Sequence, residues 1–143
     1  MRISDVISAR GPHSVVTLTA EATVTELLAT LAEHRIGAVI VSNDGEHVAG
    51  IVSERDIVRA LNREGAGILN GPVSAIMTSE VVTCEPQARL GDIAALMTER
   101  RFRHMPVVQE TKIVSIVSIG DAVKARVSQI EAERDHLMEY IHQ

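Results

Sequence analysis

The sequence predicts an α/β (α+β) protein in which two copies of one β-α-β-β-α unit pack sheet to sheet about a pseudo-twofold axis. The first observation behind this prediction is an internal repeat: residues 15–41 align with 81–107 at an offset of 66, and 51–53 with 116–118 at an offset of 65. The second is composition, because the 45% apolar content is almost all aliphatic, which suits strands packed under helices. A unit of about 60 residues cannot cover its own sheet, so the two copies are expected to share a core.

Apolar spacing predicts the elements of the first copy in order. We expect a short helix, a brief strand, a helix, two strands and a closing helix, at residues 3–7, 15–17, 24–34, 38–41, 48–52 and after 53. Thr23 followed by Glu26 is a capping box that marks the start of the second helix. Asn43-Asp44-Gly45 favours a hairpin between the two strands, because glycine accepts the positive φ of such a turn.

The second copy repeats this order, with residues 73–77 echoing 3–7, and a segment with three glycines and one proline separates the copies. We therefore divide the chain into a first motif, a linker, a second motif and a C-terminal helical extension. Their boundaries are 1–62, 63–72, 73–127 and 128–143.

The C-terminal segment is predicted to be an amphipathic helix, because its apolar residues alternate at steps of four and three over three heptads, as in a coiled coil. The stripe contains Val123, Val127, Ile130, Leu137 and Ile141, with Arg134 as its polar member. Two interpretations stay open: the stripe packs back on the body, or it pairs with a second chain in a homodimer. Arg134 needs an acidic partner in either case.

Charge and cysteine content bound the partners and the compartment. A net charge of −5 disfavours nucleic acid and anionic membrane surfaces as partners. Cys84 is the single cysteine, so no intramolecular disulfide is possible. The first residues lack the apolar core of a signal peptide, and no run approaches the ~20 apolar residues that span a bilayer. We expect a cytoplasmic protein.

The sequence contains no recognisable catalytic or metal-binding constellation. The six histidines show no metal-ligand spacing, and one cysteine cannot build a zinc site. The glycines of Gly65-Ala66-Gly67 lack the preceding strand and the third glycine of a dinucleotide fingerprint. No serine lies in a nucleophile elbow. We therefore expect a protein that is not an enzyme and that has neither a catalytic cofactor nor a metal.

One Ser-x-x-Asp sequence follows an apolar strand in each copy, as Ser53 with Asp56 and as Ser118 with Asp121. Helix capping alone could explain each pair. Both pairs nevertheless use Asp where a capping box favours Glu or Gln, and both follow the end of a strand, where ligands of α/β folds collect. A carboxylate placed there can accept from both hydroxyls of a ribose diol, and Arg55 beside Asp56 suits a phosphate. We favour the ligand role for Asp56 and Asp121.

Residues 100–106, RRFRHMP, form a positive cluster in an acidic protein. They could be a solvated turn between a helix and a strand. We favour a binding role, with Arg103 and His104 at a phosphate and Met105 and Pro106 as an apolar wall for a base. The first copy has glycine and apolar residues at the matching positions 37–39.

The repeat, the sequence GIVSERDIVRAL at residues 50–61 and the sequence RFRHMPVV at residues 101–108 together resemble a tandem CBS-domain (cystathionine β-synthase domain) pair of the stand-alone class. The resemblance covers the chain to about residue 127. It implies two clefts, related by pseudo-twofold symmetry, that bind adenosyl ligands such as AMP, ADP, ATP, S-adenosylmethionine or NAD-type dinucleotides.

The same resemblance implies roles for particular residues. Ribose would be bound by Asp56, Asp121, Ser53 and Ser118. Phosphate would be bound by Arg55, Arg103 and His104. The base would lie near Thr17, Thr83, Ala38, Val39, Met105 and Pro106. Two departures, Ser115 in place of glycine and Gly120 where the first copy has Arg55, predict unequal clefts. A phosphate near Asp121 would then need its cation from Arg101 or Arg103.

From these residues we expect a regulatory sensor that binds AMP, ATP or NAD(H), forms a homodimer and acts on a regulated protein. The alternative is a structural or protein-interaction module that works through its dimer and its C-terminal helix without any nucleotide. In that case the two Ser-x-x-Asp sequences are only helix caps.

Overall fold

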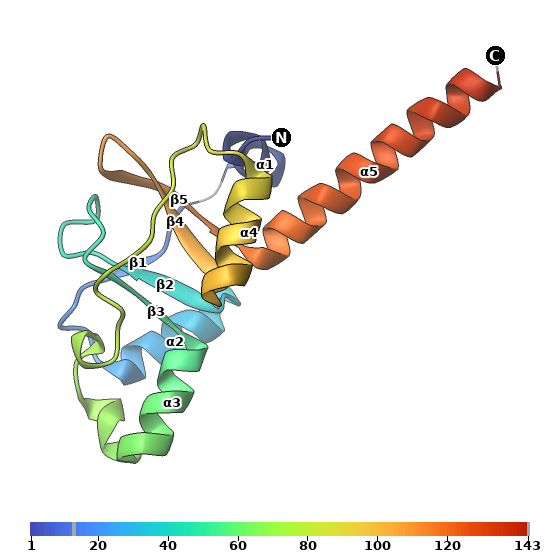
Figure 1. Cartoon of the computed structure of the whole chain (residues 1–143). Helices are drawn as coiled ribbons and strands as arrows, with labels where there is room; N and C mark the ends of the chain where they lie inside the picture. Colours follow the sequence, from blue (N-terminus) through green and yellow to red (C-terminus); the bar gives the residue numbers. More distant parts are fainter. Residues whose placement is uncertain (13, 143) are drawn as a thin grey trace.

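The computed structural model describes residues 1–12 and 14–142, and its first half forms a three-stranded sheet with helices (Figure 1). The elements are α1 (Ile3–Arg10), β1 (Thr17–Leu18), α2 (Val24–His34), β2 (Ala38–Val41), β3 (Gly50–Ser53) and α3 (Glu54–Glu64). β1 is parallel to β2, and β2 is antiparallel to β3. The predicted capping box starts α2, since the Thr23 hydroxyl accepts from the Glu26 amide at 3.1 Å.

The second half repeats the pattern, but its first helix and first strand are reduced to a 3₁₀ turn and an isolated bridge. Its elements are the 3₁₀ turns η1 (Ala66–Asn70) and η2 (Val73–Ala75), then α4 (Leu90–Arg100), β4 (His104–Gln109), β5 (Lys112–Ser118) and α5 (Ile119–Ile141). The short helix expected at 73–77 is thus a three-residue 3₁₀ turn. The chain leaves the helical conformation there because the backbone of Thr78 pairs with Ile51, at 2.9 Å in both directions. β4 and β5 form an antiparallel pair, and Cys84 bridges to Val107 where the first motif has β1.

Each motif has its own aliphatic core between its sheet and its helices, which confirms the predicted α/β class. The first core contains Leu27 and Val52, and the second contains Met97 and Met105. β2 is buried along its whole length. Val39 and Val41 belong to the first core, whereas Ile40, on the other face, is fully buried outside it. That second face lies toward the other sheet (Figure 1).

The segments that begin the two motifs, α1 and η2, are exchanged between them. Ile3 of α1 lies in the core of the second motif, and its amide donates to the carbonyl of Ala88 at 2.9 Å. Val73 of η2 lies in the core of the first motif, and its amide donates to the carbonyl of Ala22 at 2.7 Å. Each motif is therefore completed by a segment that lies outside it in the sequence.

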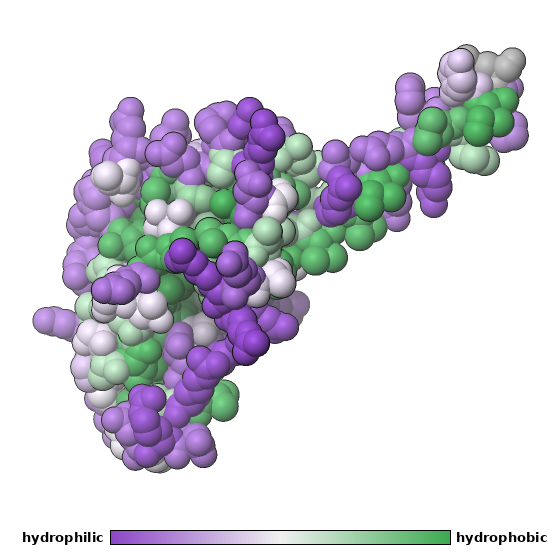
Figure 2. All heavy atoms as spheres, in the orientation of Figure 1, coloured by the Kyte–Doolittle hydropathy of each residue, from purple (hydrophilic) through white to green (hydrophobic). Residues whose placement is uncertain are grey.

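Helix α5 leaves the body after its first turns and projects away from it (Figure 1). Ala122 is buried, whereas the large apolar residues farther along are 47% or more exposed, and Figure 2 shows apolar side chains along the projecting part. The stripe does not pack back on the body of its own chain. Arg134 pairs with the adjacent Asp135 at 3.1 Å. Among the described residues, no helix is long and apolar enough to cross a membrane.

Candidate functional site

The two Ser-x-x-Asp sequences lie at equivalent junctions, from β3 into α3 and from β5 into α5. Asp56 Oδ2 accepts from the Ser53 amide at 2.8 Å, and Asp121 Oδ2 accepts from the Ser118 amide at 2.9 Å. Each serine hydroxyl accepts in turn from the aspartate amide, so both pairs are complete capping boxes. The structural role that the sequence left open is therefore present at both places. A ligand role requires a carboxylate oxygen that capping leaves available.

Capping engages only one oxygen of Asp56. Within residues 1–12 and 14–142, both hydrogen bonds to this carboxylate, from the amide and the hydroxyl of Ser53, go to Oδ2. Oδ1 therefore has no partner in that part of the chain, and the Asp56 side chain is half-buried. A half-buried carboxylate with a free oxygen can accept from a sugar hydroxyl.

A cleft of about 490 Å³ surrounds Asp56. Its walls come from both motifs: the β3–α3 junction of the first, and the segment between α4 and β4 of the second. Besides Asp56, the sequence predicted five of its polar and charged residues, Ser53, Arg55, Arg101, Arg103 and His104. Arg59, one turn after Arg55 on α3, also lines the cleft and was missed. Its helical spacing from Arg55 was the available signal.

Four arginines line this cleft together with two carboxylates, Glu54 and Asp56. Among the described residues, Arg55, Arg59, Arg101 and Arg103 form no ion pair. Arg101, which follows the last residue of α4, has a left-handed conformation with φ 58°, and the residues after it, 102–104, line the cleft. The cleft thus combines a free carboxylate oxygen with several unneutralised guanidinium groups.

A second cleft, of about 340 Å³, surrounds Asp121. It is built the same way with the motifs interchanged, from the β5–α5 junction and the segment between α2 and β2. Arg35, with φ 54°, takes the place that Arg101 has in the first cleft. Ala38, Ser118 and His104 also line this cleft, so Ala38 and His104 are shared by both.

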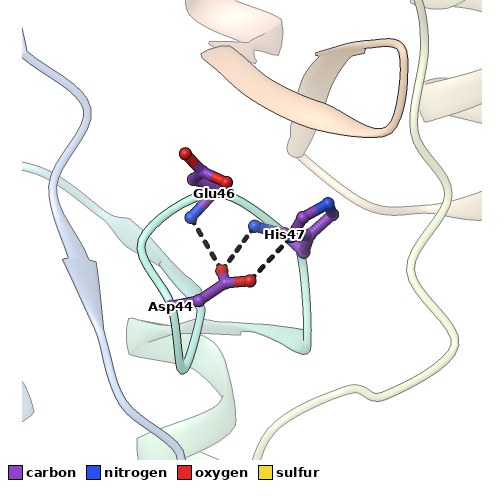
Figure 3. Close-up of side chains that lie close together, drawn as sticks. All are labelled: Asp44, Glu46 and His47. Atoms are coloured by element: carbon purple, nitrogen blue, oxygen red, sulfur yellow. Dashed lines mark hydrogen bonds and ion pairs between the residues drawn. The ribbon is translucent and has the colours of Figure 1, made fainter.

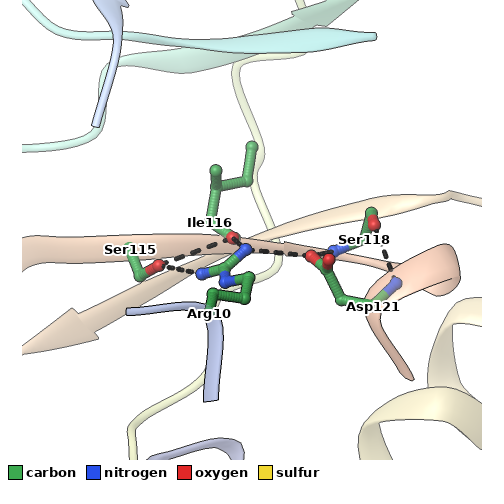
Figure 4. Close-up of polar contacts among 5 residues, drawn as sticks. All are labelled: Arg10, Ser115, Ile116, Ser118 and Asp121. Atoms are coloured by element: carbon green, nitrogen blue, oxygen red, sulfur yellow. Dashed lines mark hydrogen bonds and ion pairs between the residues drawn. The ribbon is translucent and has the colours of Figure 1, made fainter. Parts of the chain in front are cut away.

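The structure corrects the prediction of which arginine lies beside Asp121. Arg101 and Arg103 line the Asp56 cleft, on the other side of the molecule's pseudo-twofold axis. Asp121 instead pairs with Arg10 at the end of α1, at 2.9 Å between Nη1 and Oδ2 (Figure 4). Sequence comparison of the copies missed Arg10 because it lies between the aligned segments. Ser115, the departure from glycine, was the available signal, since its hydroxyl accepts from Arg10 Nη2 at 2.6 Å.

Most positions expected beside a base do not line either cleft. Within the described residues, Thr17, Thr83, Val39, Met105 and Pro106 line neither cleft, so Met105 and Pro106 do not form the expected apolar wall in this structure. Val39, Met105 and Pro106 are less than 2% exposed, because both faces of these strands are covered.

Other apolar side chains form the walls. They are Ile51, Val58 and Phe102 in the Asp56 cleft, and Val15, Val16, Ile36 and Ile116 in the Asp121 cleft. The repeat aligns Ile51 with Ile116 and Ile36 with Phe102, so symmetry within the sequence could have identified them.

His104 lies between the two clefts and packs against Gly37. A β-carbon at Gly37 would come within 3.4 Å of the His104 ring. Burial holds the pKa of His104 below its ordinary value of 6.5, with a further lowering by Arg103, while Asp121 and Glu54 act in the opposite direction. The imidazole is therefore neutral at pH 7 and can donate one hydrogen bond.

The β2–β3 hairpin loop gathers the side chains of Asp44, Glu46 and His47 (Figure 3). Their potential ligand atoms lie within 4.8 Å of one another, but all three side chains are exposed. Asp44 Oδ1 already accepts from the Glu46 and His47 amides, and Oδ2 bonds His47 Nδ1 at 2.7 Å. These bonds hold the pKa of Asp44 below its ordinary value, and the bond from the His47 amide has the largest effect. They account for the cluster as a stabilised turn.

Comparison with known proteins agrees with this fold. A family model described as CBS domain matches residues 3–63 and 73–128. The chain is 34% identical to the CBS domain-containing protein CBSX3, mitochondrial, of Arabidopsis thaliana over 146 aligned residues, covering 97% of this chain and 71% of that protein.

Solved structures of similar proteins have the same fold. The CBS-domain containing protein ATU1752 from Agrobacterium tumefaciens is 39% identical, with a TM-score of 0.83 over 88% of this chain and 99% of that one. The CBS domain protein PAE2072 from Pyrobaculum aerophilum, complexed with AMP, is 29% identical, with a TM-score of 0.74 over 85% of this chain and 89% of that one.

Proposed function

The chain belongs to the CBS-domain family, and from this premise we propose that it is a non-catalytic regulatory module that binds an adenine nucleotide of the AMP class in the Asp56 cleft. The AMP complex of the related Pyrobaculum aerophilum protein supports the class of ligand. A volume of about 490 Å³ lies within the range of small-molecule sites.

The observation that carries the proposal is the pairing of a free carboxylate oxygen with unneutralised arginines in one cleft. Asp56 Oδ1 accepts from the ribose hydroxyls, and the charge-assisted bonds contribute about 1.5–3 kcal/mol each. Arg55, Arg101 and Arg103 bind the phosphate, to which a guanidinium can donate two parallel hydrogen bonds. Ile51 and Phe102 form the apolar surface against which the adenine lies.

The regulatory part of the proposal follows from where the cleft is. Its walls belong to different motifs, so a bound nucleotide contacts both and favours one relative packing of the two. The change would reach a regulated protein through the body or through α5. ADP, ATP and NAD(H) share the adenosine group and are the alternative ligands, distinguished from AMP by the additional phosphates that the arginines must accommodate.

A second candidate function is a nucleotide-independent interaction module. The exposed apolar stripe of α5 favours it, since this surface needs a protein partner whether or not the clefts bind a ligand. We propose a second copy of the chain as that partner.

A thermal-shift experiment with AMP tests the nucleotide proposal. AMP at a hundred times its Kd should stabilise the protein by about 2.7 kcal/mol and raise the melting temperature by several degrees. 2′-Deoxy-AMP should act more weakly because it lacks one ribose hydroxyl, and inorganic phosphate alone should act least. An unchanged melting temperature with all adenine nucleotides would leave the interaction module as the better account.

A further inference from the structure

Arg10 fastens α1 to the junction that carries Asp121. Its Nη1 donates to Asp121 Oδ2 and to the carbonyl of Ile116, both at 2.9 Å, and its Nη2 donates to the Ser115 hydroxyl at 2.6 Å (Figure 4). The side chains of Arg10 and Asp121 are only 24% and 26% exposed, and Ser115 is buried. The ion pair is therefore largely shielded from water and supported by two further acceptors.

The Asp56 cleft has no equivalent of this arrangement. At the offset of 70 that aligns residues 3–7 with 73–77, the counterpart of Arg10 is the exposed Glu80. The counterpart of Ser115 is Gly50, where an added β-carbon would come within 2.6 Å of Met77 Sδ. The Asp56 cleft therefore lacks the counterparts of both Arg10 and the Ser115 hydroxyl that binds it.

We propose that Arg10 determines which cleft accepts a ribose, by neutralising the Asp121 carboxylate through Oδ2, whereas among the described residues Asp56 has no ion pair. The Arg10 guanidinium and the Ser118 amide both donate to Oδ2 of Asp121, so a ribose hydroxyl could reach Oδ1 only on a carboxylate whose charge is already paired, beside a guanidinium that lines the cleft. A ribose diol that engages both oxygens of Asp121 must displace that guanidinium, which also removes the partners of the Ser115 hydroxyl and the Ile116 carbonyl, so this mode of binding is opposed by three lost hydrogen bonds. The Asp121 cleft therefore binds AMP at least about a hundredfold more weakly than the Asp56 cleft.

The inference rests on the proposed nucleotide binding. Calorimetric titration of the chain with AMP tests the two claims separately. The wild type should bind one AMP per chain. Arg10→Met keeps the apolar stem but removes the charge, and it should bind two. Arg63→Met, which removes an exposed arginine at the end of α3, should bind one.

Ser115→Ala gives a second test if Arg10→Met folds poorly. This variant keeps the cation and removes its hydroxyl anchor, so a second AMP should bind with intermediate affinity. Adding Asp121→Asn to Arg10→Met should abolish the second binding event and retain the first.

Each result decides a different claim. A wild type that binds no AMP overturns both the proposed function and the role of Arg10. A wild type that binds two, or an Arg10→Met variant that still binds one while Ser115→Ala also binds one, overturns the role of Arg10 alone. Loss of the single wild-type site in Arg10→Met would assign Arg10 to nucleotide binding and contradict the inference.

Discussion

Asp56 distinguishes the two interpretations of the Ser-x-x-Asp sequence, as a helix cap or as a ligand-binding site. It caps α3 through Oδ2 and leaves Oδ1 for a ligand, so both roles are compatible. Asp56→Asn keeps an acceptor for the Ser53 amide but removes the charge that strengthens hydrogen bonds from ribose. We expect AMP affinity, measured by calorimetry, to fall roughly ten- to a hundredfold.

Asp92→Asn is the matched control for this substitution. Asp92 is also the third residue of its helix, α4, but it is exposed and lies outside both clefts. It should leave AMP affinity within a factor of two or so of the wild type, as expected for a surface site. Equal effects of Asp56→Asn and Asp92→Asn would identify the Ser-x-x-Asp sequence as a cap alone.

His104 should make stability depend on pH. Its pKa in the folded protein is below 6.5, so the unfolded chain binds the proton first as the pH falls. The contribution of His104 is therefore present above about pH 6.5 and is lost as the pH drops through the folded-state pKa. Urea unfolding at pH 7.5 and 5.5 should show a smaller loss of unfolding free energy in His104→Gln than in the wild type. A loss of the same size in both would mean that His104 is not responsible.

At the scale of the element, the charges beside the α5 stripe favour a parallel pair of helices. In a heptad with Val127 and Ile130 at the seam, Arg126 and Glu131 flank it on opposite sides. A parallel pairing brings Arg126 against Glu131 of the second copy, whereas an antiparallel pairing about the middle of the stripe brings the two Glu131 side chains together. We therefore expect a parallel dimer in register.

Charge reversal tests this pairing. Arg126→Glu should weaken the dimer, and Arg126→Glu combined with Glu131→Arg should restore it, as measured by sedimentation equilibrium. Arg63→Glu, on the exposed surface of α3, serves as the control. A wild type that stays monomeric at every concentration, or a double variant weaker than the single one, would rule out the parallel pair.

Most of the helices and strands were predictable because local apolar spacing marks them and the repeat shows it twice, although the helix expected at 73–77 is a three-residue 3₁₀ turn. The exchange of α1 and η2 between motifs was not, since the spacing of Ile3 and Val73 indicates a buried side chain but not which core buries it. The same limit applies to the site. The aspartates and most arginines stand beside strand ends in the sequence, whereas Arg10 reaches Asp121 across 111 residues. The burial of Met105 could not be predicted either. A strand that is buried on both faces shows no alternation of apolar and polar residues, so the sequence does not say which of its side chains a ligand can reach.

At the scale of the whole molecule, the exchanged segments should make the two motifs unfold together. Ile3 is fully buried in the core of the second motif, so Ile3→Ala should reduce the free energy of unfolding by about 2–5 kcal/mol. Leu28→Ala, at a 40% exposed position, should cost much less. Urea unfolding followed by circular dichroism should show one transition in every variant. Two separate transitions would mean that the motifs fold independently.

The unequal clefts are the central claim, and a crystal structure of the protein grown with saturating AMP tests it most directly. We predict AMP in the Asp56 cleft, with its ribose hydroxyls on Asp56, its phosphate among Arg55, Arg101 and Arg103, and Arg10 still paired with Asp121. AMP in the Asp121 cleft with the Asp56 cleft empty, or no AMP in either, would contradict the account.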